Sequence, residues 1–257
     1  MSLMELGPIE GRTAAHGSSD DLRRVNNDIG DDTNPEAARV RQTPPNREGR
    51  LLRFVLAERL AHWTYAAFFL SALVSGLLMW IPSTRNLISG SRQAFSHLHG
   101  VIGALMIGVP LLILLVLNRR QLSMDMREID MWDADDTAWF WRAVRGYTLL
   151  QRPMPPQGRL NAGQKASSIL VAALAVGFAV TGSILLAGPH ASAWLVSRAL
   201  VLHQILAVVG ITLFVTHVLH ALTTRHGRDS LRAMVHGTMS EPVAREHHEK
   251  WWHRQIG

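Results

Sequence analysis

The stretch Ala199–Leu222 reads ALVLHQILAVVGITLFVTHVLHAL, an apolar run of membrane-spanning length that contains His203, His217 and His220. A helix needs about 20 apolar residues to cross a bilayer, and an ionisable side chain inside such a helix usually has a function. His203 and His217 are 14 positions apart. This spacing places them on nearly the same face of a helix, about 21 Å apart along its axis. One face of this helix therefore offers an imidazole near each membrane surface, as a protein that holds two cofactors across a membrane requires.

Three further apolar runs accompany this one. The predicted spans are residues 62–81, 100–117, 167–187 and 199–222, within a domain of residues 50–222. Each run is apolar on all faces, whereas a surface helix of a soluble bundle is apolar along one stripe. The mean hydropathy of +0.09 hides this segregation because the ends and the middle of the chain are polar. The sequence thus predicts an all-α membrane protein with a four-helix transmembrane bundle.

Polar segments flank and divide the bundle. Residues 1–49 are rich in small, polar and charged residues without a periodic apolar face, which predicts a flexible extension. Residues 118–166 are predicted to be a long polar loop that lies against the membrane surface, a partner or the protein itself, and residues 223–257 form a basic tail. Arg and Lys gather in these three segments, so the positive-inside rule places both termini in the cytoplasm.

Several classes of protein are disfavoured by composition. The chain has no cysteine, which excludes disulfides, thiolate zinc sites and a resident iron–sulfur cluster. The net charge of +6 comes from the basic loops, and without a nucleic-acid-binding motif no nucleic-acid partner is expected. The predicted spans contain no Asp or Glu, which argues against a transporter that uses the histidines as a pathway.

Four histidines sort by depth into two pairs. With the predicted topology, His62 and His217 lie near the cytoplasmic side, and His99 and His203 lie near the opposite side. Two imidazoles that face each other across a helix bundle are a natural axial set for a haem iron. Neutral histidine also binds zinc, copper or iron, so the pairs alone do not name the cofactor.

Other histidines leave alternatives open. His220 can compete with His217 as a ligand, and His97 can compete with His99. The histidines can also be hydrogen-bonded structural residues, in which case the chain is a haem-free membrane anchor. The five histidines of the tail are expected at the surface: His226, His236, His247, His248 and His253.

The chain resembles the cytochrome b (gamma) subunit of respiratory, membrane-bound formate dehydrogenases, within a di-haem cytochrome b group that includes the cytochrome b subunits of nickel–iron hydrogenases. The resemblance covers about residues 50–257, and the N-terminal extension departs from the family pattern. It rests on an ordered set of stretches: RFVLAERLAHW (Arg53–Trp63), SHLHGVIG (Ser96–Gly103), GRLNAGQK (Gly158–Lys165), LVLHQILAVVG (Leu200–Gly210) with Thr216-His217, and SLRAMVHGTMSEPVAREHHEKWWHR from Ser230.

The resemblance implies two bis-histidine haems b. His99 and His203 would bind one haem near the periplasm, and His62 and His217 would bind the other near the cytoplasm. Such proteins belong to the bacterial cytoplasmic (inner) membrane, which they cross several times in contact with lipid.

A quinone is implied beside the cytoplasmic haem, contacted by Asn161, Gly163 and Gln164 with His217 close by. Amide groups of Asn and Gln suit a quinone carbonyl, and Gly permits close approach. Asn is also a good N-cap, so Asn161 can simply begin the third span, and both interpretations can hold together.

The function implied is electron transfer from a periplasmic iron–sulfur (beta) subunit through the haems to a quinone reduced near the cytoplasmic side. A catalytic (alpha) subunit with molybdenum or tungsten would oxidise formate, because this chain has neither cysteines for clusters nor a soluble catalytic domain. A higher oligomer of the complex is compatible with this function. The alternatives are the cytochrome b subunit of a membrane hydrogenase or another molybdoenzyme, and the haem-free anchor.

Overall fold

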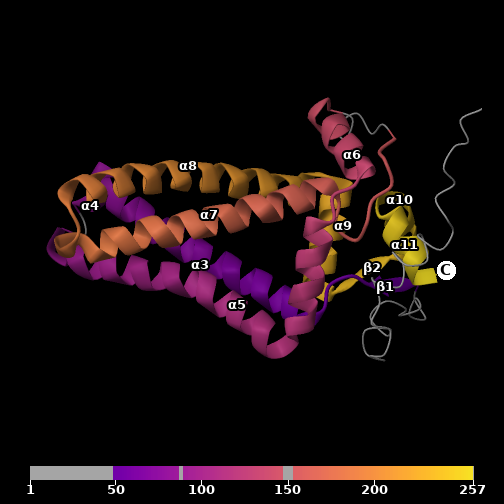
Figure 1. Ribbon diagram of the computed structural model, residues 1–257, viewed down its shortest axis with the longest axis horizontal. Helices are drawn as coiled ribbons and strands as arrows, with labels where there is room; N and C mark the ends of the chain where they lie inside the picture. Colours follow the sequence, from indigo (N-terminus) through magenta and orange to yellow (C-terminus); the bar gives the residue numbers. More distant parts are fainter. Residues whose placement is uncertain (1–48, 87–88, 147–152, 257) are drawn as a thin grey trace, which may run out of the picture. The chain divides into compact units, whose positions relative to one another are not determined.

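Four long helices dominate the computed structural model, which describes residues 49–86, 89–146 and 153–256. They are α3 (Leu56–Trp80), α5 (Arg92–Asp130), α7 (Ala162–Ala187) and α8 (Ala193–Thr223) (Figure 1). All four are long and apolar enough to cross a membrane, which confirms the four predicted helices. The predicted extension of residues 1–49 lies outside the described residues, apart from Gly49.

The long helices pack as two helical hairpins. In one hairpin α3 packs against α5, and the connection between them contains α4 (Pro82–Arg85) and the 3₁₀ turn η1 (Ser89–Ser91). In the other hairpin α7 packs against α8, and the 3₁₀ turn η2 (Gly188–His190) connects them. Contacts between α5 and α7 join the hairpins, whereas the backbone of α8 packs far less against α3 and α5 than against α7. We call the end of the bundle that carries these short connections the distal end.

Helix α5 bends sharply at Asn118, where the apolar run ends. Asn118 has non-helical dihedrals (φ −161°, ψ 71°), and its side-chain oxygen accepts a hydrogen bond of 2.9 Å from the backbone N–H of Gln121. Asn118 thereby caps a second helical segment, as asparagine commonly does. The prediction of a loop over residues 118–166 is therefore wrong for residues 119–130, for α6 (Ala134–Val144) and for residues 162–166 at the start of α7, which are helical.

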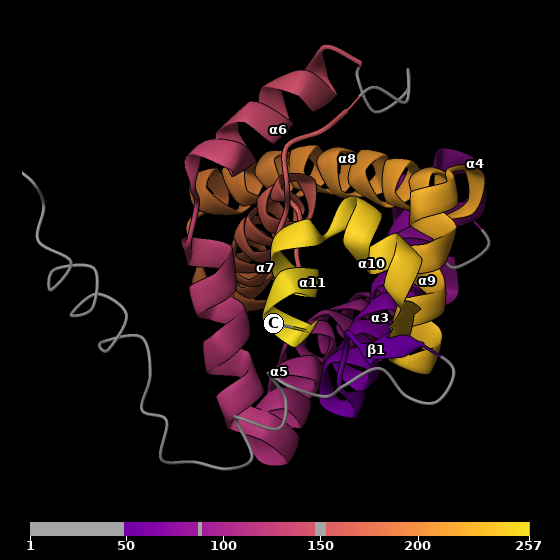
Figure 2. The same ribbon diagram turned by 90° about the vertical axis from the view of Figure 1, so that its right-hand side faces the viewer.

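Segments from both ends of the described chain form a folded layer, the terminal cap, where α3 begins and α8 ends (Figures 1 and 2). Strand β1 (Arg50–Leu52) pairs antiparallel with β2 (Thr238–Ser240), and Leu51 lies opposite Met239. Helices α9 (Arg225–His236), α10 (Glu241–His247) and α11 (Glu249–Ile256) complete the cap. Its apolar core consists of Leu51, Phe54, Ala233, Met239, Ala244 and Trp251. The basic tail of the sequence is thus a structured layer at one end of the bundle.

Candidate functional site

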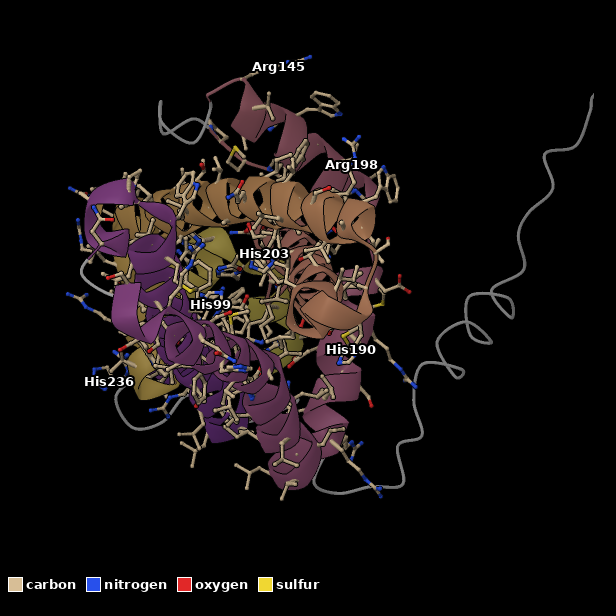
Figure 3. The ribbon with its side chains drawn as sticks, turned by 90° about the vertical axis from the view of Figure 1, so that its left-hand side faces the viewer. His99, Arg145, His190, Arg198, His203 and His236 are labelled. Carbon is tan, nitrogen blue, oxygen red and sulfur yellow. The ribbon has the colours of Figure 1, made fainter. Side chains whose placement is uncertain are left out.

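His99 of α5 and His203 of α8 face each other near the distal end (Figure 3). Their ring centres are 6.2 Å apart and their ring planes are inclined at 73°. The hydroxyl oxygen of Ser75 on α3 lies 2.9 Å from Nδ1 of His99, and that of Thr181 on α7 lies 2.7 Å from Nδ1 of His203. Each imidazole is therefore held by a hydroxyl from the neighbouring helix of its own hairpin.

His62 of α3 and His217 of α8 form a second facing pair, near the terminal cap. Their ring centres are 6.3 Å apart and their planes are inclined at 53°. Among the described residues, neither ring has a side-chain hydrogen-bond partner. The structure thus brings together the same two pairs that depth in the sequence predicted.

The two competing histidines take other positions. His97 is exposed on α5, two residues before the inward-facing His99. The ring of His220 contacts that of His226 in the terminal cap, with centres 6.5 Å apart. Geometry therefore favours His99 and His217 as the members of the facing pairs.

An aromatic layer lies at intermediate depth between the pairs. Phe69 of α3 and Phe214 of α8 have ring centres 5.4 Å apart, and Phe178 of α7 contacts the ring of His203 at 5.2 Å. Side chains rather than closely packed backbone thus connect α8 with the hairpin of α3 and α5. Phenylalanine rings therefore lie between the two histidine pairs.

The predicted quinone residues Asn161 and Gln164 form a reciprocal capping box at the start of α7. Oδ1 of Asn161 accepts a 2.9 Å hydrogen bond from the backbone N–H of Gln164, and Oε1 of Gln164 accepts one of 3.1 Å from that of Asn161. This confirms the capping role predicted for Asn161. Oε1 of Gln164 also accepts from Arg53 at 3.1 Å, so the Gln164 amide nitrogen points away from these partners. Within the described part of the chain, that nitrogen has no hydrogen-bond partner.

Gly163 lies against Trp139 of α6. A Cβ built at Gly163 would be 2.9 Å from Cη2 of the indole, so the close approach predicted at this glycine is made by a tryptophan. Lys165, two residues later in the first turn of α7, is buried and pairs with Asp136 of α6 at 2.7 Å. Helix α6 therefore covers the start of α7, and Trp139 is a neighbour of the candidate quinone residues that no local motif identified.

Arg53 is a buried cation behind the capping box, with only 2% of its surface exposed. It donates hydrogen bonds to the carbonyl of Arg159 (2.9 Å), to Gln164 (3.1 Å) and to the hydroxyl of Ser230 (3.1 Å). Burial and the nearby charge of Arg159 lower the pKa of Arg53 to about 9, which still leaves it protonated at neutral pH. An arginine that precedes a transmembrane helix is an ordinary flanking residue, so nothing in the sequence marked this role.

Arg159 lies among three carboxylates from two helices. It pairs with Glu58 of α3 at 2.6 Å, with Glu128 of α5 at 2.8 Å and with Asp125 of α5. Burial would lower the pKa of Arg159, but the three carboxylates outweigh it and raise this pKa. The network ties the segment before α7 to the base of the first hairpin.

His248 of the terminal cap is fully buried, which corrects the prediction that it lies at the surface. Its Nδ1–H donates a 2.7 Å hydrogen bond to the carbonyl of Gly158. Burial, together with the charge of Arg53, lowers the pKa of His248 well below its ordinary value. This imidazole is neutral at physiological pH.

His226 is also partly buried rather than exposed. Its Nε2 lies 3.4 Å from the amide nitrogen of Asn161, and its ring centre lies 4.6 Å from that of His247. Burial and the neighbouring His247 lower the pKa of His226 to about 3. Only two of the five tail histidines, His236 and His253, are exposed as predicted.

A helical membrane bundle with one facing histidine pair near each end is the arrangement expected of a membrane cytochrome b. The family model described as prokaryotic cytochrome b561 matches residues 53–237. The chain therefore belongs to this family, whose members are haem b proteins, and it is a multi-pass protein of the bacterial inner membrane.

Curated relatives include two cytochrome subunits of formate dehydrogenases. The cytochrome b556(fdo) subunit of formate dehydrogenase from Escherichia coli (strain K12) is 28% identical over 211 residues, which cover 80% of this chain and 93% of that protein. The cytochrome b556(Fdn) subunit of the nitrate-inducible formate dehydrogenase of the same strain is 24% identical over 207 residues, covering 79% and 90%. The similarity thus spans nearly the whole of both relatives.

The histidine pairs fit the axial positions of a haem iron. A metal–imidazole bond is about 2 Å long and the ring centre lies about 1 Å further, so imidazoles on opposite sides of one iron have centres about 6 Å apart. The observed separations are 6.2 and 6.3 Å. No three or more His, Cys, Asp or Glu side chains of residues 49–86, 89–146 and 153–256 converge as a metal site. Paired imidazoles are therefore the available donor sets.

Proposed function

We propose that this chain is the membrane cytochrome b subunit of a formate dehydrogenase complex. In this role it passes electrons from a periplasmic iron–sulfur subunit, through two haems b, to a quinone that is reduced near the cytoplasmic side. The observation that carries the proposal is the presence of one facing histidine pair near each end of the bundle. Similarity to two formate dehydrogenase cytochromes over most of the chain supports the choice of complex.

The two facing histidine pairs support the assignment of the haem ligands. His99 and His203 hold one haem near the distal end, and His62 and His217 hold the other near the terminal cap. A bound haem iron supplies one-electron redox chemistry at each position. The basic residues of the terminal cap and the middle segment support a cytoplasmic position for the cap by the positive-inside rule, with the distal end towards the periplasm.

The quinone site lies at the start of α7, beside the cap-side histidines. The amide nitrogen of Gln164 is the donor for a quinone carbonyl, because Arg53 and the capping box hold the oxygen of the same amide. Asn161 fixes the helix start, and Gly163 with Trp139 provides an apolar wall for the flat ring. Quinone reduction at this end takes its protons from the cytoplasm, so electron transfer across the bundle separates charge.

Other subunits supply the remaining chemistry. Formate oxidation requires a molybdenum- or tungsten-containing catalytic subunit and an iron–sulfur subunit, since this chain has no cysteine to hold clusters. A hydrogenase donor would use the same two haems. Reduction of the haems by formate but not by hydrogen in the purified complex supports the formate dehydrogenase assignment, and the reverse result contradicts it.

Single histidine substitutions test the ligand assignment. In the purified complex, His217→Ala and His203→Ala should each lose one of two haems and abolish quinone reduction. His236→Ala, which removes an exposed histidine of the cap, is the matched control and should retain both haems. Full haem content and quinone reduction in His217→Ala would overturn the assignment.

A further inference from the structure

We propose that a serine–glycine pair on α3 and a threonine–glycine pair on α7 orient the distal axial histidines and lower the reduction potential of the haem that they bind. The two pairs are Ser75-Gly76 and Thr181-Gly182, and each contacts a histidine on the next helix of its hairpin. This inference rests on the proposed function, because it concerns the haem held by His99 and His203.

The hydrogen bonds of Ser75 define which nitrogen of His99 is free. The Ser75 hydroxyl lies 2.9 Å from the backbone carbonyl of Ser71, one turn earlier on α3. The hydroxyl also lies 3.1 Å from the carbonyl of Ala72, and we assign its single proton to these backbone carbonyls, so that its oxygen accepts from Nδ1–H of His99. Nδ1 of His99 therefore carries the proton, and Nε2 presents its lone pair.

Thr181 repeats this arrangement in the second hairpin. Its hydroxyl lies 2.7 Å from the carbonyl of Gly177 and 2.7 Å from Nδ1 of His203. The same proton count makes His203 an Nδ1–H donor with a free Nε2. In the neutral imidazole, which is the form that binds a metal, a proton on Nδ1 leaves Nε2 available as the ligand in both distal histidines.

The glycine of each pair lies against the edge of the same imidazole. A Cβ built at Gly76 would be 3.2 Å from Cε1 of His99, and one at Gly182 would be 3.9 Å from Cε1 of His203. The hydroxyl and the glycine are adjacent in sequence in both cases, and both lie on the first helix of a hairpin whose second helix carries the histidine. The two hairpins therefore hold their histidines by the same two-residue device.

The cap-side pair lacks this device. Among the described residues, no side chain accepts a hydrogen bond from a ring nitrogen of His62 or His217. An acceptor on the second nitrogen of an axial histidine makes the imidazole more basic, which favours the oxidised metal. The distal haem should then have the lower reduction potential, and this difference favours electron movement from the distal end towards the cap, as the proposed function requires.

Conservative variants of the haem-loaded protein test the inference. We expect Ser75→Ala and Thr181→Val to raise the midpoint potential of one haem in an optical redox titration, with the larger rise in the double variant. The electron paramagnetic resonance signal of the same oxidised haem should shift, because the electron donation of its ligands changes. The potential of the other haem should stay constant.

Matched controls separate this role from a general effect on the bundle. Thr181→Ser and Ser75→Thr keep the hydroxyl and should preserve the wild-type potential. Ser71→Ala removes a hydroxyl of the same helix that, among the described residues, donates only to the carbonyl of Ala67, and it should change neither haem. Loss of the distal haem alone in the double variant, with recovery in the hydroxyl-retaining variants, would also support the inference.

The inference is overturned if both haems are present in Ser75→Ala and Thr181→Val and neither potential moves, or if both potentials move together. These outcomes leave the proposed function intact. Failure of the proposed function is seen in a different measurement, the haem content of the wild-type protein, which would then be fewer than two haems per chain.

Discussion

The ammonium group of Lys165 lies 2.7 Å from a carboxylate oxygen of Asp136, and the two side chains are only 7% and 3% exposed. The same ammonium group donates to the carbonyl of Met131 at 2.7 Å. This buried pair joins α6 to the start of α7 and so holds Trp139 over Gly163. Removing one member of such a pair leaves an uncompensated buried charge, which is costly.

Replacement of Lys165 by methionine should therefore loosen α6. We expect Lys165→Met to lower the free energy of unfolding by about 3–5 kcal/mol, measured by thermal or denaturant unfolding in detergent, and to expose the α6 segment to protease. The matched control is Lys250→Met, because Lys250 pairs with Asp133 and Asp135 while 33% exposed. A partly exposed pair contributes about 1 kcal/mol or less, so equal losses in both variants would contradict this role.

A methyl group at Gly163 should disturb the candidate quinone site. A Cβ there meets a rigid indole at 2.9 Å and 3.0 Å, so we expect Gly163→Ala to cost about 1–3 kcal/mol and to raise the KM for quinone. Gly177→Ala is the control, since its Cβ meets the end of the flexible Leu206 side chain, at 2.8 Å. Quinone kinetics that respond equally to both substitutions would exclude a local effect of Trp139.

The positive charge of Arg159 should stabilise the contact between the segment before α7 and the first hairpin. Arg159→Leu removes the cation that pairs with Glu58, Asp125 and Glu128, so we expect a large loss of stability. Arg159→Lys keeps the charge but lacks the planar fork that reaches several oxygens, and should lie in between. Thermal unfolding in detergent checks the order of the variants, and equal losses in both would contradict it.

The buried histidines of the terminal cap should make the protein sensitive to acid. The pKa of His226 falls to about 3 in the folded state, so the unfolded chain binds more protons once pH drops below about 6.5. Stability should therefore decrease as pH falls from about 6.5 towards about 3, and this slope should be shallower in His226→Gln.

The exposed His253 supplies the comparison for this pH dependence. Thermal unfolding of His253→Gln should follow the wild-type pH profile, because His253 is exposed at the surface of the terminal cap, unlike His226. If His226→Gln and His253→Gln have the same profile as the wild type, burial of His226 is not a source of the acid sensitivity.

The four-helix bundle was predictable because each of its helices corresponds to one long, continuous apolar run of the sequence. Each of the four runs is apolar on all faces over a full membrane thickness, and the 14-residue spacing between His203 and His217 places the two histidines of α8 on one face at two depths. Pairing with His99 and His62 then followed from depth alone. The four helices and the two histidine pairs could be predicted because the length of the apolar runs and the histidine spacing specify them without knowledge of tertiary contacts.

The terminal cap was not predictable in the same way. Strands β1 and β2 have three residues each and pair Leu51 with Met239, from opposite ends of the sequence, so no periodic pattern marks them. Likewise, His248 is buried against Gly158, which lies 90 positions away in the sequence. The bend at Asn118 depends on a single side-chain cap within an otherwise helical stretch.

The hydroxyls that hold the distal histidines were also invisible in the sequence. Serine and threonine in membrane helices commonly bond the carbonyl of the preceding turn. Ser75 and Thr181 do so. Only the packing of neighbouring helices reveals that each also lies within hydrogen-bond distance of an imidazole. For the same reason, the motif that begins at Asn161 indicated a ligand site but did not indicate that Trp139 of α6 lies against Gly163.

The central claim is that the two facing histidine pairs each hold a haem. The most direct test is a dithionite-reduced minus oxidised spectrum of the purified protein, with haem quantified per polypeptide. Two b-type haems per chain are expected. A well-folded preparation with one haem or none would contradict the claim, and in the second case the histidines would be structural residues of a membrane anchor.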